Sequence, residues 1–517
     1  MNRNKLMLLN TITVIGMTLI TIVLGMVEVR LIIWKYGPEV NGLMQTGNQA
    51  MSYLSLIESG ICAAFLLHMY KAVAQKDDTQ LSALYNGFRQ SMVKIVNKMA
   101  ICALVISLLY PLVLKKENLS YLYMMTVFAL LSAKMILPYI VTLVPKYMII
   151  LSEQRYKAEL ISGGFRVVTY AIEILLLLYT NLPLHSLLIV CVLVSLISGV
   201  VFHFVMKRLY TDRLNKRVLP DTCPTQMTKD VLAHNVSSMV FNSTDNIIIS
   251  IFRSLGDVTV YSNYNMISLQ VTSLLTNIID GAAASMGIKI VQGDKNSYSV
   301  YREIFTGTMW IGAMISSVYF VMINDFVGLW VGTEYVLSFH NVLLFAVIMY
   351  CNILFPALLI ARNAKGLYKE SKNFTIWQTI LNLGLTVLLV PKLGICGALI
   401  GTILARICIT IPFNYRIVEK RVFANQKTKW VELLLGIIIA AIGAVLGIMI
   451  KWLLEIVMPT GTNIYLLFVV EAFLVSLMVG LVTVGLFYFI FPDYRRLVVR
   501  IMMTIKRMFW KKMNANV

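Results

Sequence analysis

The sequence predicts an all-α integral membrane protein with about fourteen transmembrane helices. Of its 517 residues, 58% are hydrophobic and only 14% are charged, and the mean hydropathy is +0.77. A soluble domain carries about 25% charged residues. The apolar residues form long blocks, and roughly 20 such residues cross the hydrocarbon core as a helix. Barrel strands would instead alternate over about 10 residues, so the spans are helical.

We expect the helices in order along the chain from these apolar blocks. The first six are predicted at 9–34, 41–70, 92–114, 119–149, 157–181 and 185–206. The next six follow at 231–252, 257–288, 303–324, 335–361, 374–391 and 394–418, and the last two at 430–454 and 462–490. The first block is too long for the apolar region of a signal peptide and lacks a small-x-small cleavage site before Glu28.

Positive charge predicts that both termini are cytoplasmic. With the N-terminus placed inside, the inner loops and tails hold 35 of the 45 Lys and Arg residues and the outer loops hold 6. Retained Lys and Arg mark the cytoplasmic side of membrane helices. The basic runs at 207–217 and 495–512 are therefore interpreted as topology anchors beside anionic lipid. The net charge of +20 does not point to nucleic acid.

The connectors and the cysteines exclude several classes of function. The longest connector is 207–230, and the outer loops are only a few residues long. They leave no room for a soluble catalytic domain or a nucleotide-binding loop, so we expect no enzyme, no catalytic residue and no cofactor. The seven cysteines form no CxxC or Cys/His cluster, and the five histidines lack ligand spacing. We expect no metal site.

The two halves of the chain repeat weakly but in order. The stretch 37–64 parallels 256–285, and Pro145 and Pro356 precede similar Tyr-Lys pairs. We predict an N-lobe of helices 1–6 (1–206), a cytoplasmic linker (207–230), a C-lobe of helices 7–12 (231–425), and helices 13–14 with a basic tail (426–517). Parallel lobes of this kind enclose a central cavity and expose it alternately in transporters. Duplication for packing alone is the other interpretation.

The layout of six, six and two helices resembles the multidrug/oligosaccharidyl-lipid/polysaccharide exporter superfamily. Within it, the chain is similar to bacterial polysaccharide flippases of the Wzx type. The residues that carry the likeness are 34-WKYGPEVNGLMQTGNQAMSYLSLIESGICAAF-65, the basic loop 71-KAVAQKDD-78 and the linker 153-EQRYKAE-159.

The resemblance implies a bacterial inner-membrane flippase for undecaprenyl-diphosphate-linked oligosaccharide, the repeat unit of a surface polysaccharide such as O-antigen, lipopolysaccharide or capsule. It would work by alternating access as an antiporter, with H⁺ or Na⁺ as the coupling ion and no ATP hydrolysis of its own. Its partners would be the lipid-linked oligosaccharide, membrane lipids and a polysaccharide polymerase complex.

Ionisable residues at membrane depth are the candidate site, because a charge there is costly unless it is paired or faces water. We expect Arg30, Lys134 and Arg166 to line the central cavity at three depths and bind the diphosphate, for which Arg is suited to bidentate contact. Asp245 and Glu28 are the candidates for ion coupling. Structural pairing is the alternative, in particular Arg166 with Glu173 two turns later on the same helix face.

Three rival functions follow from the same residues. A multidrug exporter of the same fold needs an acidic, aromatic cavity, which the three N-lobe cations disfavour. A membrane-embedded polymerase or glycosyltransferase needs outer-loop carboxylates or a large loop. A peptidoglycan-precursor flippase would share both the layout and the cationic cavity. The glycan, the coupling ion and the oligomeric state are not encoded in any recognisable pattern.

Overall fold

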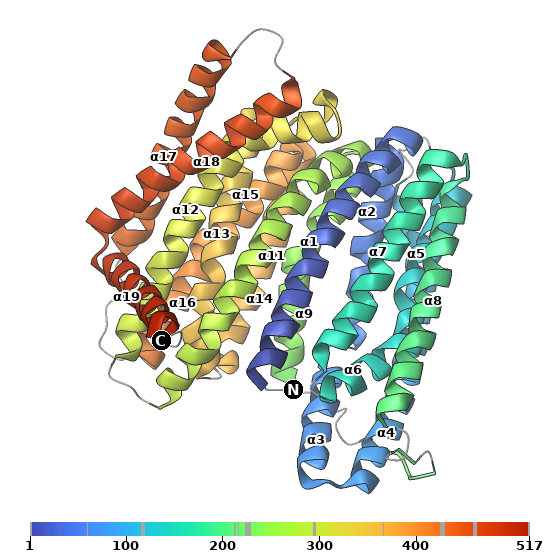
Figure 1. Cartoon of the computed structure of the whole chain (residues 1–517). Helices are drawn as coiled ribbons and strands as arrows, with labels where there is room; N and C mark the ends of the chain where they lie inside the picture. The colour runs from blue at the N-terminus through green and yellow to red at the C-terminus, as the bar shows by residue number, and fades with distance from the viewer. Residues whose placement is uncertain are drawn as a thin grey trace. The chain divides into compact units, whose positions relative to one another are not determined.

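The computed structural model of the chain is helical in every regular element that it describes (Figure 1). The described residues are 3–58, 60–114, 119–152, 154–210, 214–215, 217–222, 229–292, 296–365, 367–423, 430–458 and 463–514. They divide into two compact units, unit 1 (Met1–Ser262) and unit 2 (Asn263–Val517). Each unit is described by itself.

Unit 1 contains the helices of the first half of the chain. They are α1 (Arg3–Tyr36), α2 (Pro38–Ser52), the 3₁₀ turn η1 (Tyr53–Ile57), α3 (Ile61–Gln75), α4 (Asp78–Val113), α5 (Tyr121–Pro138), the π-helical turn η2 (Tyr139–Leu143), α6 (Val144–Leu151), α7 (Arg155–Tyr179), α8 (Leu184–Leu209), α9 (Lys229–Ser243), α10 (Asp245–Phe252) and the start of α11 (Leu255–Val291).

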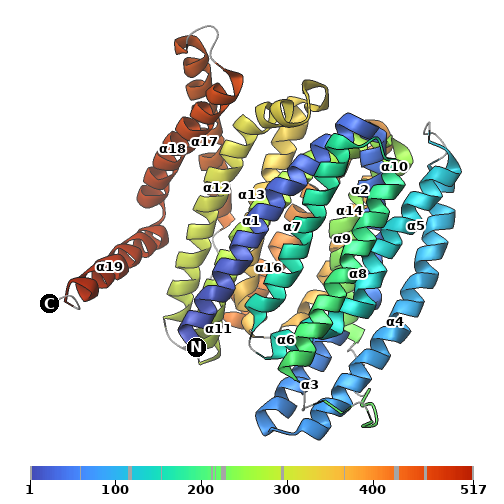
Figure 2. The same ribbon diagram turned by 45° about the vertical axis from the view of Figure 1, so that its right-hand side comes forward.

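Two close approaches define the packing of α1 on α7, which run side by side in Figures 1 and 2. At Gly163 an added Cβ would lie 2.7 Å from Met17, and at Gly25 one would lie 3.3 Å from the Tyr170 hydroxyl oxygen. Small residues let membrane helices approach closely where lipid supplies no hydrophobic drive. The two glycines therefore set the distance at which side chains of α1 and α7 meet.

Two of the membrane crossings in unit 1 are broken. The run α2–η1–α3 is interrupted before Gly60, whose φ of +84° lies in the left-handed region that glycine enters at no steric cost. The run α9–α10 is interrupted at Thr244. The breaks contact each other, because the Tyr53 and Thr244 hydroxyl oxygens lie 2.8 Å apart and the Asn246 amide donates to Gln49 Oε1 at 3.2 Å. Polar side chains thus replace backbone hydrogen bonds lost at the breaks.

Part of the long connector is held against unit 1. The Asp221 amide donates to the Ala83 carbonyl at 2.9 Å, and Asn86 Nδ2 donates to the Val218 carbonyl at 2.8 Å. Gly87 makes this contact possible, because a Cβ there would lie 1.8 Å from the Asp221 carbonyl oxygen. Residues 211–213, 216 and 223–228 of the predicted linker, Cys223 among them, lie outside the described residues.

Unit 2 contains the rest of α11 and the helices of the second half. They are α12 (Ser297–Trp330), the 3₁₀ turn η4 (Thr333–Tyr335), α13 (Phe339–Ala364), α14 (Tyr368–Leu393), α15 (Ile395–Ala405), the π-helical turn η5 (Arg406–Thr410), α16 (Ile411–Ile417), the π-helical turn η6 (Val418–Val422), α17 (Trp430–Val457), α18 (Ile464–Ile490) and α19 (Pro492–Asn514).

Helix α12 is the central element of unit 2. It packs against α13, α17, α18 and α19 (Figure 1). Within its most apolar stretch of 18 residues, 61% is buried. Its buried face joins a core that includes Phe305, Met309, Tyr415 and Phe487. A membrane helix surrounded by other helices needs no lipid-facing stripe, which accounts for the buried polar residues Thr306 and Ser317 along it.

The fourteen predicted segments all correspond to helical segments, and the chain is a multi-pass membrane protein. Eleven helices among the described residues are long and apolar enough to span a bilayer. The other three predicted segments correspond to α2–α3 and α9–α10, which are broken, and to α11, which carries many polar residues. The basic tail, for which no helix was predicted, forms most of α19.

The boundary between the compact units differs from the predicted lobe boundary at 206/231. It falls at Ser262/Asn263, inside α11, because α9 and α10 pack on α2 and η1 in unit 1. Among the prolines of the helices, Pro138 and Pro145 flank η2, and Pro412 follows η5. Pro356 lies inside α13, which continues through it.

Candidate functional site: a charged cluster in unit 1

Helices α1, α5, α7 and α8 bring a group of ionisable side chains together inside unit 1. The Lys134 ammonium of α5 lies 3.8 Å from Oε1 of Glu173 on α7. The Glu173 side chain is only 4% exposed, whereas that of Lys134 is 37% exposed. At 1.5 Å rise per residue, Lys134 lies about 20 Å from Tyr121 at the start of α5, and Glu173 lies about 9 Å from Tyr179 at the end of α7. Both depths fall within a hydrocarbon core of about 30 Å. A paired charge at this depth is a functional candidate.

Two further groups complete the arrangement. The Cys191 thiol of α8 donates a hydrogen bond to Glu173 Oε1 at 2.5 Å. The Glu28 carboxyl of α1 lies beside that of Glu173 and within electrostatic range of Lys134 and Tyr170. We call Glu28, Lys134, Tyr170, Glu173 and Cys191 the charged cluster.

The charged cluster holds two carboxyl groups against one ammonium group. Two neighbouring carboxylates repel each other, so a pair of this kind can share one proton or hold a cation. Glu173 Oε2 has no hydrogen-bond partner among the described groups. Uptake or loss of a proton here therefore changes the charge that faces Lys134.

The structure brings Lys134 and Glu28 together but places Arg166 and Arg30 differently. Arg166 is exposed on α7, one turn before Tyr170 and within its electrostatic range. The structure does not place Arg166 in an ion pair with Glu173, the alternative that the sequence left open, since the ion pair of Glu173 is with Lys134.

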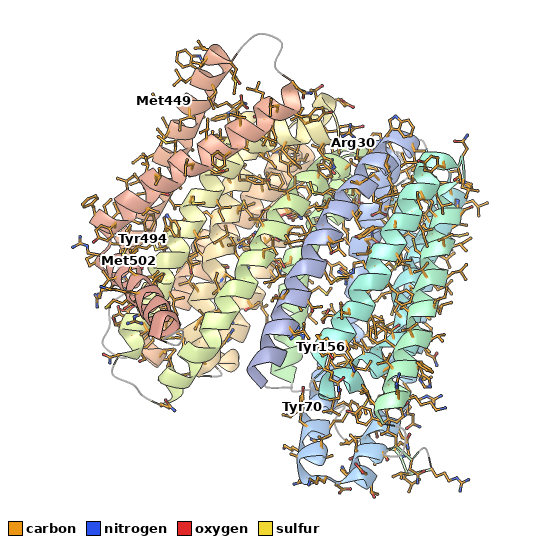
Figure 3. All side chains as sticks on the ribbon, in the orientation of Figure 1. Arg30, Tyr70, Tyr156, Met449, Tyr494 and Met502 are labelled. Atoms are coloured by element: carbon orange, nitrogen blue, oxygen red, sulfur yellow. The ribbon has the colours of Figure 1, made fainter. Side chains whose placement is uncertain are left out.

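Arg30 lies on another face of its helix. It is exposed near the end of α1 that leads to Tyr36 (Figure 3). It lies two positions after Glu28, and residues so spaced do not share a helix face. It makes no ion pair within the described part of the chain.

Asp245 belongs to a separate polar junction in unit 1. It is the first residue of α10, and the Tyr261 hydroxyl donates to its Oδ2 at 2.7 Å. The adjacent Thr244 meets Tyr53 at the break described above. Discontinuous helices place ends of helix dipoles inside transporters, where they bind ions and substrates. Asp245 is therefore positioned at such a break and not in the charged cluster.

Sequence reasoning did not identify Tyr170 and Cys191, and it assigned Glu173 the wrong partner for the observed ion pair. Lys134 and Glu173 are 39 positions apart on different helices, so no spacing rule joins them. The only signal was the depth of Glu173 within an apolar block. Among the described residues, no group of three or more His, Cys, Asp or Glu side chains is arranged to hold a metal ion.

Comparison with known proteins identifies the fold. No family model and no curated sequence matches the chain. A solved structure of the lipid II flippase MurJ, in an inward closed conformation, aligns with a TM-score of 0.70 at 12% identity and covers 92% of this chain and 99% of MurJ. The chain has a MurJ-like fold.

A second solved structure has a related fold. It is an inward-facing multidrug resistance MATE transporter of the MOP superfamily, with a TM-score of 0.55 at 12% identity. It covers 78% of this chain and 98% of the transporter.

Proposed function

We propose that this protein translocates a lipid-linked oligosaccharide, the undecaprenyl-diphosphate-linked repeat unit of a surface polysaccharide, across the bacterial inner membrane. The observation that carries the proposal is the MurJ-like fold over 92% of the chain. The short connectors support it, because they leave no soluble domain for a synthetic reaction. The charged cluster supports it as well, because the partly exposed ammonium group of Lys134 suits an anionic lipid headgroup.

The charged cluster supplies a mechanism for coupling. Lys134 is held by Glu173 at 3.8 Å, so a diphosphate must compete with a carboxylate for the same ammonium group. When both carboxyls of the Glu28–Glu173 pair are protonated, Lys134 becomes available to the diphosphate, and loss of a proton lets the carboxylate recapture Lys134 and displace the headgroup. A proton and the headgroup are therefore bound together at the charged cluster, which differs from the antiport that the resemblance implies. Arg166, one turn from Tyr170, and Arg30 would meet the headgroup at other depths.

Asp245 is proposed as a second coupling residue. Its place at the break between α9 and α10 gives it both a helix N-terminus and the Tyr261 hydroxyl as neighbours. Asp245→Asn keeps the hydrogen bond from Tyr261 and removes the charge. Transport by this variant should lose its dependence on the pH or sodium gradient. An unchanged dependence removes Asp245 from the coupling mechanism.

The substrate is tested in proteoliposomes. Purified protein is reconstituted with lipid-linked oligosaccharide, and the exposure of its sugars in the outer leaflet is followed with a membrane-impermeant sugar-oxidising enzyme. Lipid II and a fluorescent organic cation are offered in parallel. Faster exposure of the oligosaccharide supports the proposal. Movement of lipid II alone, or of the cation alone, assigns the protein to the corresponding rival function.

The site is tested with two variants and a matched control. Lys134→Ala and Arg166→Ala should each lower oligosaccharide translocation at normal expression. Lys98→Ala removes an exposed lysine of α4 and should leave the rate unchanged. Full translocation by both Lys134→Ala and Arg166→Ala would falsify the site assignment. The proposal for the substrate would be unaffected, because it is tested separately.

A further inference from the structure

A second site lies on α4 and α8, away from the residues used above. It is a pocket of about 500 Å³ lined by residues of α4, η2, α6 and α8, and α5 packs beside both long helices (Figure 2). Its polar lining includes Tyr85 and Arg89 of α4 and His203 of α8. Its apolar lining includes Val93 and Val200.

The mouth of the pocket opens on a lipid-facing surface. Val93 is 48% exposed, Ile140 is 48% exposed and Val200 is 70% exposed. Exposed aliphatic side chains on transmembrane helices contact lipid chains. A molecule that enters the pocket from this side therefore comes from the bilayer.

Two independent counts place the polar end of the pocket at the level of lipid headgroups. Roughly 20 residues cross the hydrocarbon core. Counted back from Val113 at the end of α4, such a span ends at Lys94, and Arg89 lies five residues beyond it. Counted on from Leu184 at the start of α8, the span ends at His203. The start of α4 and the end of α8 lie on the side that the charge distribution predicts to be cytoplasmic. Lys207 and Arg208 continue the basic surface in the last turn of α8.

The polar groups are suited to a phosphate. Arg89 has no ion pair within the part of the chain that the structure describes, and it lies within electrostatic range of the Tyr85 hydroxyl. A guanidinium group binds phosphate oxygens bidentately. His203 faces the same pocket from α8. Basic pockets between transmembrane helices on the cytoplasmic side bind anionic lipid headgroups.

The floor of the pocket follows from a local irregularity. The π-helical turn η2 interrupts the α5–α6 crossing, and π-turns occur frequently at functional sites. Gly199 of α8 allows η2 to come close, because a Cβ there would lie 2.4 Å from Val141 Cγ2. The absence of a side chain at Gly199 thus lets Val141 of η2 pack against α8 in the wall of the pocket.

We propose that this pocket binds one anionic glycerophospholipid of the cytoplasmic leaflet, with the phosphate at Arg89 and His203 and the first part of an acyl chain along Val93 and Val200. A volume of about 500 Å³ accommodates a small headgroup and several methylene groups. It does not accommodate an oligosaccharide, so the occupant is a membrane phospholipid and not the transported lipid.

The proposal is tested by native mass spectrometry of the full chain in detergent with added palmitoyl-oleoyl phosphatidylglycerol. We expect one tightly retained lipid. Arg89→Gln should weaken its binding about tenfold, as loss of a charge-assisted hydrogen bond does. Val200→Trp should fill the pocket and also release the lipid. The controls are Lys98→Gln, on the opposite face of α4, and Ile197→Trp, on the same exposed side of α8 but outside the pocket lining.

Four outcomes would overturn the proposal. One is equal retention by wild type, Arg89→Gln and Val200→Trp. Another is an equal loss in the two control variants. The third is equal retention of the zwitterionic palmitoyl-oleoyl phosphatidylcholine. The fourth is displacement of the lipid by millimolar inorganic phosphate, which would assign the site to a free anion. The readout is bound lipid, so it is independent of any result on transport.

Discussion

The two units of this protein differ in how closely their buried charged side chains are paired. In unit 2, Arg302 of α12 is paired with both Glu432 of α17 and Asp493 of α19, near one end of α12. Near its other end, Lys451 of α17 lies 2.5 Å from Asp325. In unit 1, Lys134 and Glu173 lie farther apart, at 3.8 Å, and a second carboxyl, that of Glu28, lies beside Glu173. Close pairs join helices, whereas a looser buried pair is costly and is retained for function.

The largest expected effect concerns the unit 2 pairs. Arg302 is 7% exposed and its two partners are 13% and 16% exposed. Arg302→Ala should lower the free energy of unfolding by about 3–5 kcal/mol, because it leaves the Glu432 carboxylate without its cation and Asp493 with only the exposed Arg496. Thermal unfolding in detergent measures the loss. Arg496→Ala, which removes an exposed partner of the same Asp493, should change stability by less than about 1 kcal/mol. Equal losses in both variants would contradict the structural role.

The next effect concerns the close packing of the broken helix α2. A Cβ at Gly42 would lie 1.9 Å from the Leu255 carbonyl oxygen, which is backbone and cannot rotate away. Gly42→Ala should therefore destabilise the protein by about 3 kcal/mol. Gly16→Ala on α1 has nothing within 4 Å of the added methyl group and should be neutral or stabilising by about 0.5–1 kcal/mol. The melting temperatures of the two variants in detergent check this contrast.

The charged cluster should show the reverse pattern, with a large effect on transport and a small one on stability. Lys134→Gln and Glu173→Gln should each slow translocation about tenfold, and the double variant should lose no more than either single one, because each change breaks the same pair. Melting temperatures should stay close to that of the wild type. Additive transport losses would show that the two residues act separately.

The smallest effect is expected at Arg30, which lies on a different face of α1 from Glu28. Arg30→Gln should reduce translocation by about twofold or less, since an exposed charge without an ion pair contributes little. The proteoliposome assay used for Lys134 measures it. A loss as large as that of Lys134→Gln would show that Arg30 contributes to headgroup translocation as much as Lys134 does.

Hydropathy was sufficient to locate the helical segments, because each membrane crossing needs a long apolar block whichever helices pack beside it. It did not reveal the breaks at Gly60 and Thr244, because a few polar residues within a long apolar block leave the hydropathy of the block high. It also began the predicted helices too late at α4 and α12, which begin at Asp78 and Ser297, since their first turns are polar. A helix can continue beyond the membrane into water, where its residues are polar and the hydropathy of the segment is low.

The candidate site was only partly predictable, because it depends on how neighbouring helices pack. Depth along a helix can be counted from the sequence, and it singled out Glu28, Lys134 and Arg166. The direction in which a side chain points on that helix depends on its neighbours. The Lys134–Glu173 pair depends on α5 meeting α7, and the Arg89–His203 pocket depends on α4 and α8 flanking η2. Neither arrangement has a spacing pattern in the chain.

The thiol contact of Cys191 with Glu173 has a practical consequence for spectroscopic work. Distance measurements with attached spin labels or fluorophores usually begin by replacing every native cysteine with serine or alanine. Cys102 and Cys408 are exposed and can be exchanged freely. At position 191, alanine would remove a donor from a carboxylate and serine would substitute a stronger one. A labelling background for this protein is best built with that one sulfur left in place.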